Sequence, residues 1–328
     1  MSTLAPPIPG LRARAYRPDD AGPLAELFNR SAEADGAPWR ASGAEIANWM
    51  ARSNEHFDAA RDALVVEADG AMVAFRDVEW IDTNDGLREY RLGGTVHPDW
   101  RGRGIGTWLF RDSEAHARAR DAAHPTDAPR FYGTWQPNSA DGALALVAAE
   151  GYEPVRWFFD MARPTLDGIV EPPLPDGLEL RPVAADQLRQ LWDADIEAFR
   201  DHWGGFDGSD ARFREWQSDP KFDPSLFVVA WDGNEIAGGV INEINETENR
   251  AFDRRRGWLA SVFVRRPWRR RGLARAVVAR SLVVLRDRGM TSAGLGVDAD
   301  NPTGALRLYE EAGFEPEFRS TAFRKPME

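Results

Sequence analysis

The sequence contains no cysteine, which excludes disulfide bonds, thiolate metal ligands and a cysteine nucleophile. Positive charge is also in deficit: 41 Lys and Arg stand against 53 Asp and Glu, so the net charge is −12 at pH 7. A chain of that charge is a poor general binder of nucleic acid, which requires a basic face. Lysine is scarce, because only Lys221 and Lys325 occur and every other basic residue is an arginine or a histidine.

Long apolar runs are missing as well. No stretch approaches the roughly 18–20 apolar residues that span a membrane, and the first residues, MSTLAPPIPGLRARAYRP, lack the apolar core of a signal peptide. The five histidines show no metal-ligand spacing, so no metal site is expected. We therefore expect a cytoplasmic protein, a monomer or homodimer, whose partners include neither a membrane nor a nucleic acid.

What the chain does contain is one sequence unit written twice. Its 328 residues are enough for two domains. Four short segments recur in the same order at a nearly constant offset: Arg17-Pro18 with Arg181-Pro182, Asp69-Gly70 with Asp232-Gly233, Val96–Gly106 with Val264–Ala274, and Gly151-Tyr152 with Gly313-Phe314. Such ordered recurrence indicates a tandem duplication.

A segment rich in proline and glycine separates the two copies. Residues 164–177, PTLDGIVEPPLPDG, cannot form a helix or a central strand because proline lacks the backbone donor that both need. We predict an N-terminal domain over residues 1–165, a linker over residues 166–177 and a C-terminal domain over residues 178–328.

Both copies show the same order of expected elements: a helical region, a hairpin, a strand, a glycine-containing turn, a helix, a strand, a helix and a last strand. In the second copy we expect a strand over 258–264, a helix over 273–288 and a strand over 293–297. A further helix is expected to start at Asn301-Pro302 and to end at Gly313. The predicted fold class is α/β (α+β), with a mixed, mostly antiparallel sheet flanked by helices in each domain.

The turn between strand and helix is the part of each copy that suggests chemistry. In the second copy, small residues at Gly272 and Ala274 let backbone approach a ligand, and successive N–H groups at a helix N-terminus bind anions. Neighbouring arginines can pair with phosphate oxygens. This pattern favours a pyrophosphate site over a P-loop, because no Gly-Lys-Ser/Thr follows. The alternative is a tight turn with surface arginines, which the recurrence of the turn in the first copy disfavours.

With these residues the chain resembles the GNAT-type N-acetyltransferases. The acyl-CoA loop of that family, Arg/Gln-x-x-Gly-x-Gly/Ala, is similar to the segments that start at Arg101 and at Arg269. The family's later motif is similar to residues 301–314, NPTGALRLYEEAGF. The resemblance covers nearly the whole chain as two units, an arrangement similar to the two-domain, mycothiol-synthase-like acetyltransferases.

The resemblance implies direct transfer of an acetyl group from acetyl-CoA, as co-substrate, to a primary amine of a small molecule or peptide, with no metal. It implies that the turns hold the CoA pyrophosphate, that the preceding strand pairs with the pantetheine arm and that Asn301 orients this arm. The implied CoA-binding residues are Val262, Phe263, Val264, Arg269, Arg270, Arg271, Gly272, Leu273, Ala274 and Asn301 in the second copy. In the first copy they are Val96, Arg101, Gly102, Arg103, Gly104, Ile105 and Gly106.

Tyr309 is the general acid that the resemblance implies, giving its proton to the departing thiolate. The alternative is a core aromatic on an amphipathic helix. Counting back from Gly151 as from Gly313 places Val147 at the corresponding position of the first copy, and valine has no proton to give. We therefore expect the C-terminal domain to catalyse, and the N-terminal domain to be degenerate, either binding CoA without turnover or serving only a structural role.

The general base and the acceptor site are less defined. The resemblance implies a glutamate where Trp258 stands, and tryptophan cannot act as a base. Glu243, at a strand end, is the candidate, with a solvated loop charge as the alternative. His202 and Trp203 are candidates for the acceptor wall, with packing at a helix end as the alternative. A non-catalytic acyl-CoA-binding or regulatory protein stays open as a second function.

Overall fold

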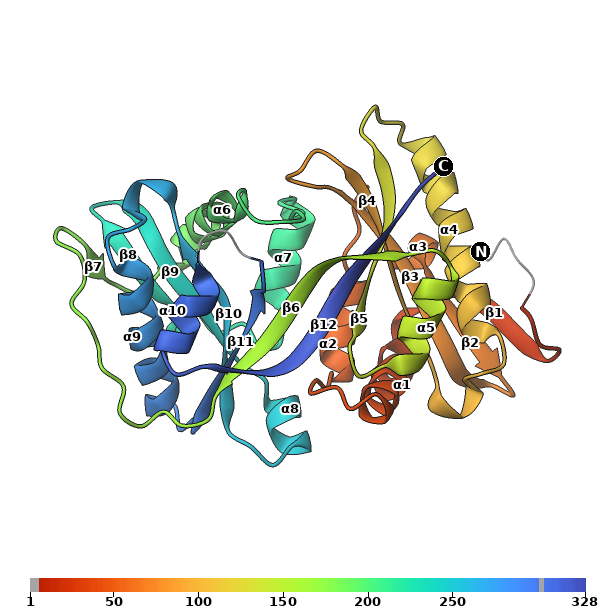
Figure 1. Ribbon diagram of the computed structural model, residues 1–328, viewed down its shortest axis with the longest axis horizontal. Coiled ribbons are helices and arrows are strands. Elements are labelled where there is room, and N and C mark those ends of the chain that lie inside the picture. Colours follow the sequence, from red (N-terminus) through yellow and green to blue (C-terminus); the bar gives the residue numbers. More distant parts are fainter. Residues whose placement is uncertain (1–5, 301–303) are drawn as a thin grey trace. The chain divides into compact units, whose positions relative to one another are not determined.

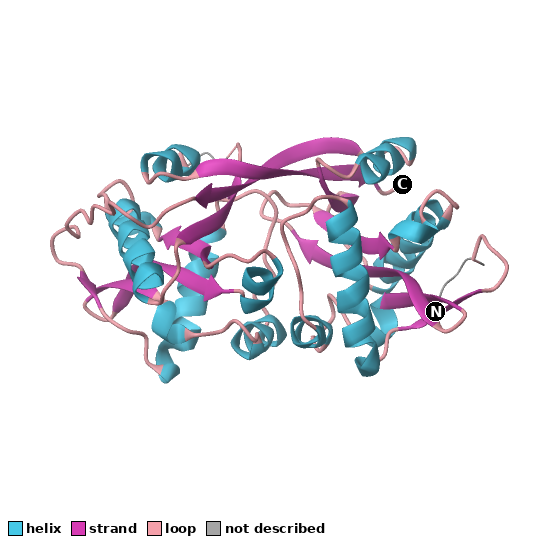
Figure 2. Ribbon diagram, turned by 90° about the horizontal axis from the view of Figure 1, so that it is seen from below, coloured by secondary structure: helices cyan, strands magenta, loops and turns pink. Residues whose placement is uncertain are grey.

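The computed structural model describes residues 6–300 and 304–328, which divide into two compact units. The N-terminal unit comprises the described chain up to Trp157, together with Ser218–Pro220 and Arg319–Glu328. The C-terminal unit comprises Phe158–Gln217 and Lys221–Phe318. In each unit helices lie on both faces of the strands (Figure 1, Figure 2), which confirms the predicted layering of helices on a sheet.

The strands of the N-terminal unit lie in the order β1-β2-β3-β4-β5-β12. Neighbouring strands pair antiparallel, except for the parallel pair β4–β5. The strands are β1 (Leu11–Ala15), β2 (Ala63–Ala68), β3 (Ala71–Asp82), β4 (Arg88–Val96), β5 (Arg130–Pro137) and β12 (Glu315–Pro326). The helices are α1 (Ala21–Ala34), α2 (Gly43–Met50), α3 (Ala59–Asp62), α4 (Ile105–Ala123) and α5 (Asp141–Ala149).

The C-terminal unit repeats this plan with the order β6-β11-β10-β9-β8-β7. Here the parallel pair is β10–β11, and the other neighbours pair antiparallel. The strands are β6 (Glu153–Arg163), β7 (Glu179–Leu180), β8 (Val228–Asp232), β9 (Glu235–Ile244), β10 (Arg256–Val264) and β11 (Ser292–Asp298). The helices are α6 (Leu188–Phe199), α7 (Asp210–Ser218), α8 (Glu246–Ala251), α9 (Leu273–Asp287) and α10 (Ala305–Glu311).

Local sequence signals account for the main elements of each unit. The Asp69-Gly70 turn, with both residues at positive φ, joins β2 to β3, as a two-residue hairpin requires. Helix α9 begins at Leu273, as the apolar spacing predicts, and ends one residue before the predicted end. The predicted helix start at Asn301-Pro302 lies outside the described residues.

The last strand of each repeat completes the sheet of the other repeat. Strand β6 is encoded at the end of the first copy, and its residues 158–163 pair with β11 of the C-terminal unit. Strand β12 is encoded at the end of the second copy, and its residues 320–326 pair with β5 of the N-terminal unit. The compact units therefore divide the chain at Trp157 and Phe158 and not within residues 166–177.

The proline-rich segment packs on the C-terminal unit. Leu166 is buried, and its backbone N–H donates to the Thr291 carbonyl at 3.1 Å. Ile169 and Leu174 pack against the same apolar cluster as α9. This segment is therefore an extended cover on one helix layer, in keeping with its lack of helix and strand propensity.

A buried ion pair fixes β12 in the N-terminal unit, and we expect Arg324→Met to destabilise that unit by about 3–5 kcal/mol. Arg324 donates to Glu89 at 2.6 Å, and Glu89 is fully buried. Among the described residues, the substitution leaves this carboxylate with Arg91, at 3.2 Å, as its remaining partner. Urea unfolding measures the loss. The control is Arg307→Met, which removes an exposed partner of Glu311 and should change stability by about 0.5 kcal/mol or less. Equal effects of the two substitutions would contradict this role for Arg324.

Candidate active site

A turn with two left-handed residues connects β10 to α9. Arg270 has φ +59° and Gly272 has φ +88°, a backbone region in which glycine carries no Cβ penalty. Within the described chain, the backbone N–H groups of residues 270–275 donate no hydrogen bond. Consecutive unpaired N–H groups at the N-terminus of the 15-residue helix α9 form an anion-binding concavity.

The three arginines of this turn have different partners. Arg269 donates to the Val264 carbonyl at 3.0 Å, to the Ala198 carbonyl at 3.0 Å and to Asp201 at 2.6 Å, so it fastens the turn to the end of α6. Arg271 donates to the Asp176 carbonyl at 3.2 Å. Arg270 is exposed and makes no hydrogen bond or ion pair with any described residue. Of the three, Arg270 is thus the one whose guanidinium is uncommitted.

Strands β10 and β11 diverge shortly before the turn. Their parallel pairing covers only Arg256–Trp258 on β10 and Ser292–Gly294 on β11. Beyond Trp258, the β10 edge that includes Val262, Phe263 and Val264 has no recorded pairing to β11 in the described chain. A β-bulge at Ala260 interrupts the register with β9 at the same place. Bulges re-aim backbone groups, and here the bulge adjoins an unpaired strand edge.

The N-terminal unit has the same turn but a different strand. Gly102 and Gly104 have φ +73° and +81°, and the N–H groups of residues 102–107 donate no hydrogen bond to the rest of the described chain. Arg101 has the same kinds of partner as Arg269, namely the Val96 carbonyl at 3.2 Å and Asp35 at 2.6 Å. The parallel pairing of β4 and β5 is again short, but the register of β4 with β3 runs without a bulge.

Comparison with known proteins places this architecture. The model of the acetyltransferase (GNAT) family matches residues 24–129 and 188–314, which is more than half of the chain and one match per unit. The chain belongs to the GNAT acetyltransferase family. It is a tandem member, and the GNAT fold expected from the sequence is confirmed in both units.

Similar curated and solved proteins agree with this assignment. Mycothiol acetyltransferases of Geodermatophilus obscurus and Thermobispora bispora are 29% and 32% identical, over 77% and 67% of this chain and 79% and 70% of their own lengths. A GCN5-related N-acetyltransferase of Sphaerobacter thermophilus is 32% identical with a TM-score of 0.71, covering 98% of this chain and 96% of that one. A tandem GNAT protein from the clavulanic acid pathway shares the fold, with 16% identity, a TM-score of 0.70, and 97% and 99% covered.

Tyr309 of this acetyltransferase lies in α10 with its ring in the apolar cluster of the α9 side. The cluster includes Val262 of β10 and Val297 of β11, which flank the point where the strands diverge. The ring packs edge-on against Phe314 at 6.1 Å. The hydroxyl forms no hydrogen bond with any described residue. Burial raises the pKa of Tyr309 to about 12, so the hydroxyl keeps its proton at neutral pH.

The corresponding position of the N-terminal unit holds Val147, which is fully buried in the cluster with Tyr132 and Tyr152. Each of these two tyrosine hydroxyls already has a partner, Arg118 at 2.7 Å for Tyr132 and Glu114 at 3.1 Å for Tyr152. The N-terminal unit therefore offers no unpartnered hydroxyl comparable to that of Tyr309 at this place in its described core. Asn301, the other residue expected from the later motif, lies outside the described residues.

The opposite face of the C-terminal sheet carries Glu243, the candidate base, and Trp203, a candidate for the acceptor wall. Trp258 and Glu243 are cross-strand partners, so both side chains lie on the face away from α9. Trp203 packs against Phe158 of β6, with ring centroids 6.0 Å apart, and His202 packs on Phe199 at 4.4 Å. Glu243 and Trp203 are half-buried and each has a further interaction. The structure thus brings Trp203 to β6, two residues from an acidic side chain.

That acidic residue, Asp160, is the one that sequence reasoning missed. It lies in β6, opposite Gly296 of β11, on the same face as Trp258. Burial, followed by the nearby carboxylates Glu248 and Glu317, raises the pKa of Asp160 to about 6. No motif marks Asp160, because β6 is encoded in the first repeat and neither copy alone indicates that it pairs with a strand of the second.

A second acidic group faces the site from α6. Asp195 accepts a hydrogen bond from the Ser261 hydroxyl at 2.6 Å, just after the bulge of β10. Burial raises the pKa of Asp195 to about 6, and the Ser261 hydrogen bond opposes the rise. Asp195 is therefore committed to holding β10 against α6.

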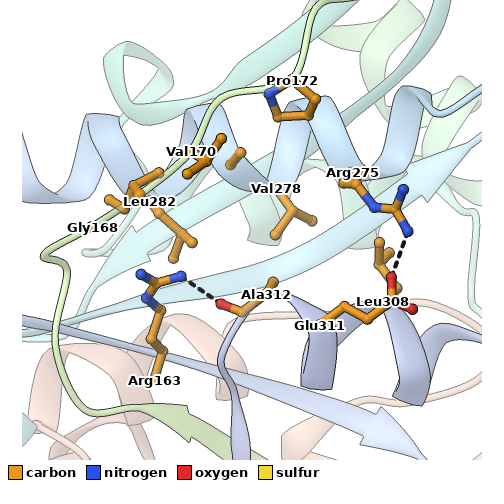
Figure 3. Close-up of a pocket in the computed structure, with 12 residues that line it drawn as sticks. Arg163, Gly168, Val170, Pro172, Arg275, Val278, Leu282, Leu308, Glu311 and Ala312 are labelled. Atoms are coloured by element: carbon orange, nitrogen blue, oxygen red, sulfur yellow. Dashed lines mark hydrogen bonds and ion pairs between the residues drawn. The ribbon is translucent and has the colours of Figure 1, made fainter.

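A cavity of about 290 Å³ is lined by residues of α9, α10 and the proline-rich segment (Figure 3). The linker residues Gly168–Pro172 cover it, and two contacts border it: Arg163 to the Ala312 carbonyl and Arg275 to Glu311. None of the predicted site residues is among its described lining residues. In the part of the chain that the structure describes, no three His, Asp or Glu side chains gather as metal ligands, and no helix is long and apolar enough to cross a membrane.

Proposed function

We propose that the C-terminal unit transfers the acetyl group of acetyl-CoA to a primary amine of a small molecule or peptide, and that the N-terminal unit does not turn over. The observation that carries the proposal is the Tyr309 hydroxyl beside the diverging strands β10 and β11, which has no hydrogen-bond partner among the described residues. The N-terminal unit has the same turn but a buried valine at this position and no bulge in its strand.

The turn and strand of the C-terminal unit fit acetyl-CoA. The unpaired N–H groups of residues 270–275 would hold the pyrophosphate, with Arg270 as an added cation. The free edge of Val262, Phe263 and Val264 would pair with the amide groups of the pantetheine arm. Arg269 acts as a positioning residue, because its guanidinium is engaged by the Val264 and Ala198 carbonyls and by Asp201. Asn301 remains a proposed contact to this arm.

Acetyl-CoA supplies an activated acyl group, and the protein positions the amine and manages two protons. A backbone N–H at the bulge of β10 would donate to the thioester oxygen as negative charge develops there. Tyr309 would give its proton to the departing sulfur. A carboxylate on the Trp258 face would take the proton that the amine loses, with Glu243 and Asp160 as the candidates on that face. Much of the acceleration would come from holding the two reactants together.

The acceptor is a cationic amine in this proposal. The chain carries a net charge of −12, which attracts a cation over long range at low salt. Relatives of this chain are named mycothiol acetyltransferase, a name that supports acetyl transfer as the reaction. The general base that the resemblance implies is absent here, because Trp258 stands in place of the glutamate. A different small amine or a peptide N-terminus is therefore the acceptor class we favour.

Release of free CoA tests this function. The protein is mixed with acetyl-CoA and one member of a panel: glucosamine, spermidine, an aminoglycoside or a short peptide with a free N-terminus. We expect CoA release with at least one amine, and a thermal shift with acetyl-CoA alone. A thermal shift without turnover on any amine would favour a non-catalytic acyl-CoA-binding protein and contradict the proposal.

A further inference from the structure

The carboxylate of Asp160 stands alone beside an open part of the sheet. It forms no hydrogen bond or ion pair with any described residue. Opposite it on β11 is Gly296, where an added Cβ would find only Asp160 Oδ1 within 4 Å among the described atoms, at 3.7 Å. Among the described residues, Asp160 is thus the one that contributes a side-chain atom within 4 Å of the position above Gly296.

This open surface adjoins the place where the acetyl group is expected. Gly294 is the last residue of β11 that pairs with β10, and the Trp258 ring covers it, 2.9 Å from where its Cβ would be. Gly296 follows on the same face, one step beyond the point of divergence. Asp160 thus lies across β11 from the gap between β10 and β11, on the same face of the sheet as Trp258.

The charged groups around Asp160 are all engaged with one another. Glu248 of α8 accepts from Trp258 Nε1 at 3.1 Å and from Arg254 at 3.2 Å. Arg256 of β10 and Glu317 of β12 form a bidentate ion pair. Glu248 and Glu317 repel a charge on Asp160, while Arg256 favours it. Asp160 is left as the group available to an incoming cation.

The N-terminal unit provides an internal control, because its sheet has the same register. Gly133 is the last residue of β5 that pairs with β4, as Gly294 is for β11. Two residues on, Trp135 takes the place of Gly296, and the residue opposite is Ala322 in place of Asp160. Arg91 lies over the Trp135 ring at 5.1 Å. The open surface at Gly296 and the Asp160 carboxylate therefore occur in the unit that has Tyr309. In the N-terminal unit, which has Val147 in place of Tyr309, both are replaced.

We propose that Asp160, supplied by the last strand of the first repeat, is the general base for acetyl transfer in the C-terminal unit and receives a proton from an ammonium group bound over Gly296. The inference rests on the proposed function. The pairing of β6 with the C-terminal unit then has a catalytic role as well as a structural one, because β6 brings to the second repeat a side chain that this repeat does not encode. It also explains why Trp258 can replace an acidic residue on β10.

Two protein groups, Asp160 and Tyr309, accept and donate the protons of the reaction. The bound ammonium group first gives one proton to the Asp160 carboxylate, which passes it to solvent. The neutral amine nitrogen then bonds to the thioester carbon and gives a second proton to Asp160. The carbon–sulfur bond breaks, and the sulfur takes a proton from Tyr309. Asp160 then holds one proton more and Tyr309 one fewer, and transfer through solvent restores both. The products are the acetamide, free CoA and one proton released to solvent, with no oxidant or reductant required.

The pH profile of Asp160→Asn is the decisive measurement. With the amine from the panel that gives the fastest CoA release, kcat at saturating amine should fall about 100-fold or more at pH 7.5. The KM for acetyl-CoA should stay within twofold. The wild type should lose tenfold in kcat per pH unit below about pH 6, because a protonated Asp160 cannot accept a proton. This limb should vanish in the variant.

Two further measurements separate a base from a structural residue. Hydroxylamine is largely neutral at pH 7.5, so the variant should lose much less activity with hydroxylamine than with a strongly basic amine. Glu317→Gln removes a charge that repels ionised Asp160 and frees Arg256, so the acid limb should move to lower pH while the plateau of kcat is kept. The melting temperature of Asp160→Asn should not fall, because an unpaired, partly buried carboxylate is replaced by a neutral amide.

Failure of the inference and failure of the function look different. If the wild type releases no CoA with any amine, both are overturned. If the wild type turns over and Asp160→Asn has the same kcat and the same acid limb, the function stands and Asp160 is not the base. If Glu243→Gln instead removes the limb, the base is Glu243 and this inference is overturned.

Discussion

Replacing Tyr309 by Phe should lower kcat for acetyl transfer by about 10²–10⁴-fold, the range typical of a lost general acid. The ring stays in place against Phe314, because only an unpartnered hydroxyl is removed. Folding stability should therefore hardly change, and acetyl-CoA affinity should stay within twofold. Steady-state CoA release with a panel amine measures kcat, and calorimetric titration measures affinity.

The matched control for Tyr309→Phe is Tyr152→Phe in the N-terminal unit. It removes a buried hydroxyl of the same kind, but one that donates to Glu114 at 3.1 Å. We expect it to cost about 1 kcal/mol of stability and no activity. A Tyr309→Phe variant with wild-type kcat would remove Tyr309 from the mechanism. A thiol leaving group of low pKa in place of CoA should reduce the defect, since such a group needs less protonation.

Short-range signals were enough to predict the repeated plan of the fold. The Asp-Gly hairpins, the apolar spacing of α9 and the two glycine turns each depend on residues close in sequence, and each is found where expected. The difference between Tyr309 and Val147 could also be predicted from nearby residues. Each position is counted back from the glycine that follows its helix, α10 or α5. The family then follows from motifs that keep their spacing.

Long-range pairing could not be predicted in the same way. The exchange of β6 and β12 between the repeats depends on which strand edge each one pairs with. The sequence of a short apolar strand does not specify its partner strand. Asp160 was missed for that reason, since its role depends on lying opposite Gly296. The bulge at Ala260 also has no sequence mark, because one extra residue in a strand leaves the apolar pattern nearly intact.

The roles of the three arginines in the turn could not be predicted from the sequence either. Charge alone suggested that all three face phosphate, but Arg269 donates to two carbonyls and Asp201, and Arg101 repeats this role in the other unit. A guanidinium has five donors and can fasten a loop as well as bind an anion. Only the paired geometry of α6 and the turn separates the two uses.

Substituting Gly272 by Val should abolish most activity, whereas the same change at Gly104 should not. Both glycines cap a long helix, at φ +88° and +81°, and an added Cβ would meet no described atom within 4 Å at either place. The strain is therefore of the backbone alone, about 1–3 kcal/mol for a residue held in a conformation it disfavours. The two variants form a matched pair in which folding cost is equal.

Relief of that strain turns the peptide groups of the turn away from their common direction. In the C-terminal unit this disperses the N–H groups of residues 270–275, so acetyl-CoA binding should weaken by about 30-fold, equivalent to about 2 kcal/mol. kcat/KM for acetyl-CoA should fall by the same factor. Gly104→Val should leave kcat/KM within twofold. If the N-terminal unit also binds CoA, this variant should bind fewer CoA molecules per chain in calorimetric titration, with no change in activity. Loss of turnover in Gly104→Val with wild-type turnover in Gly272→Val would reverse the assignment of the catalytic unit.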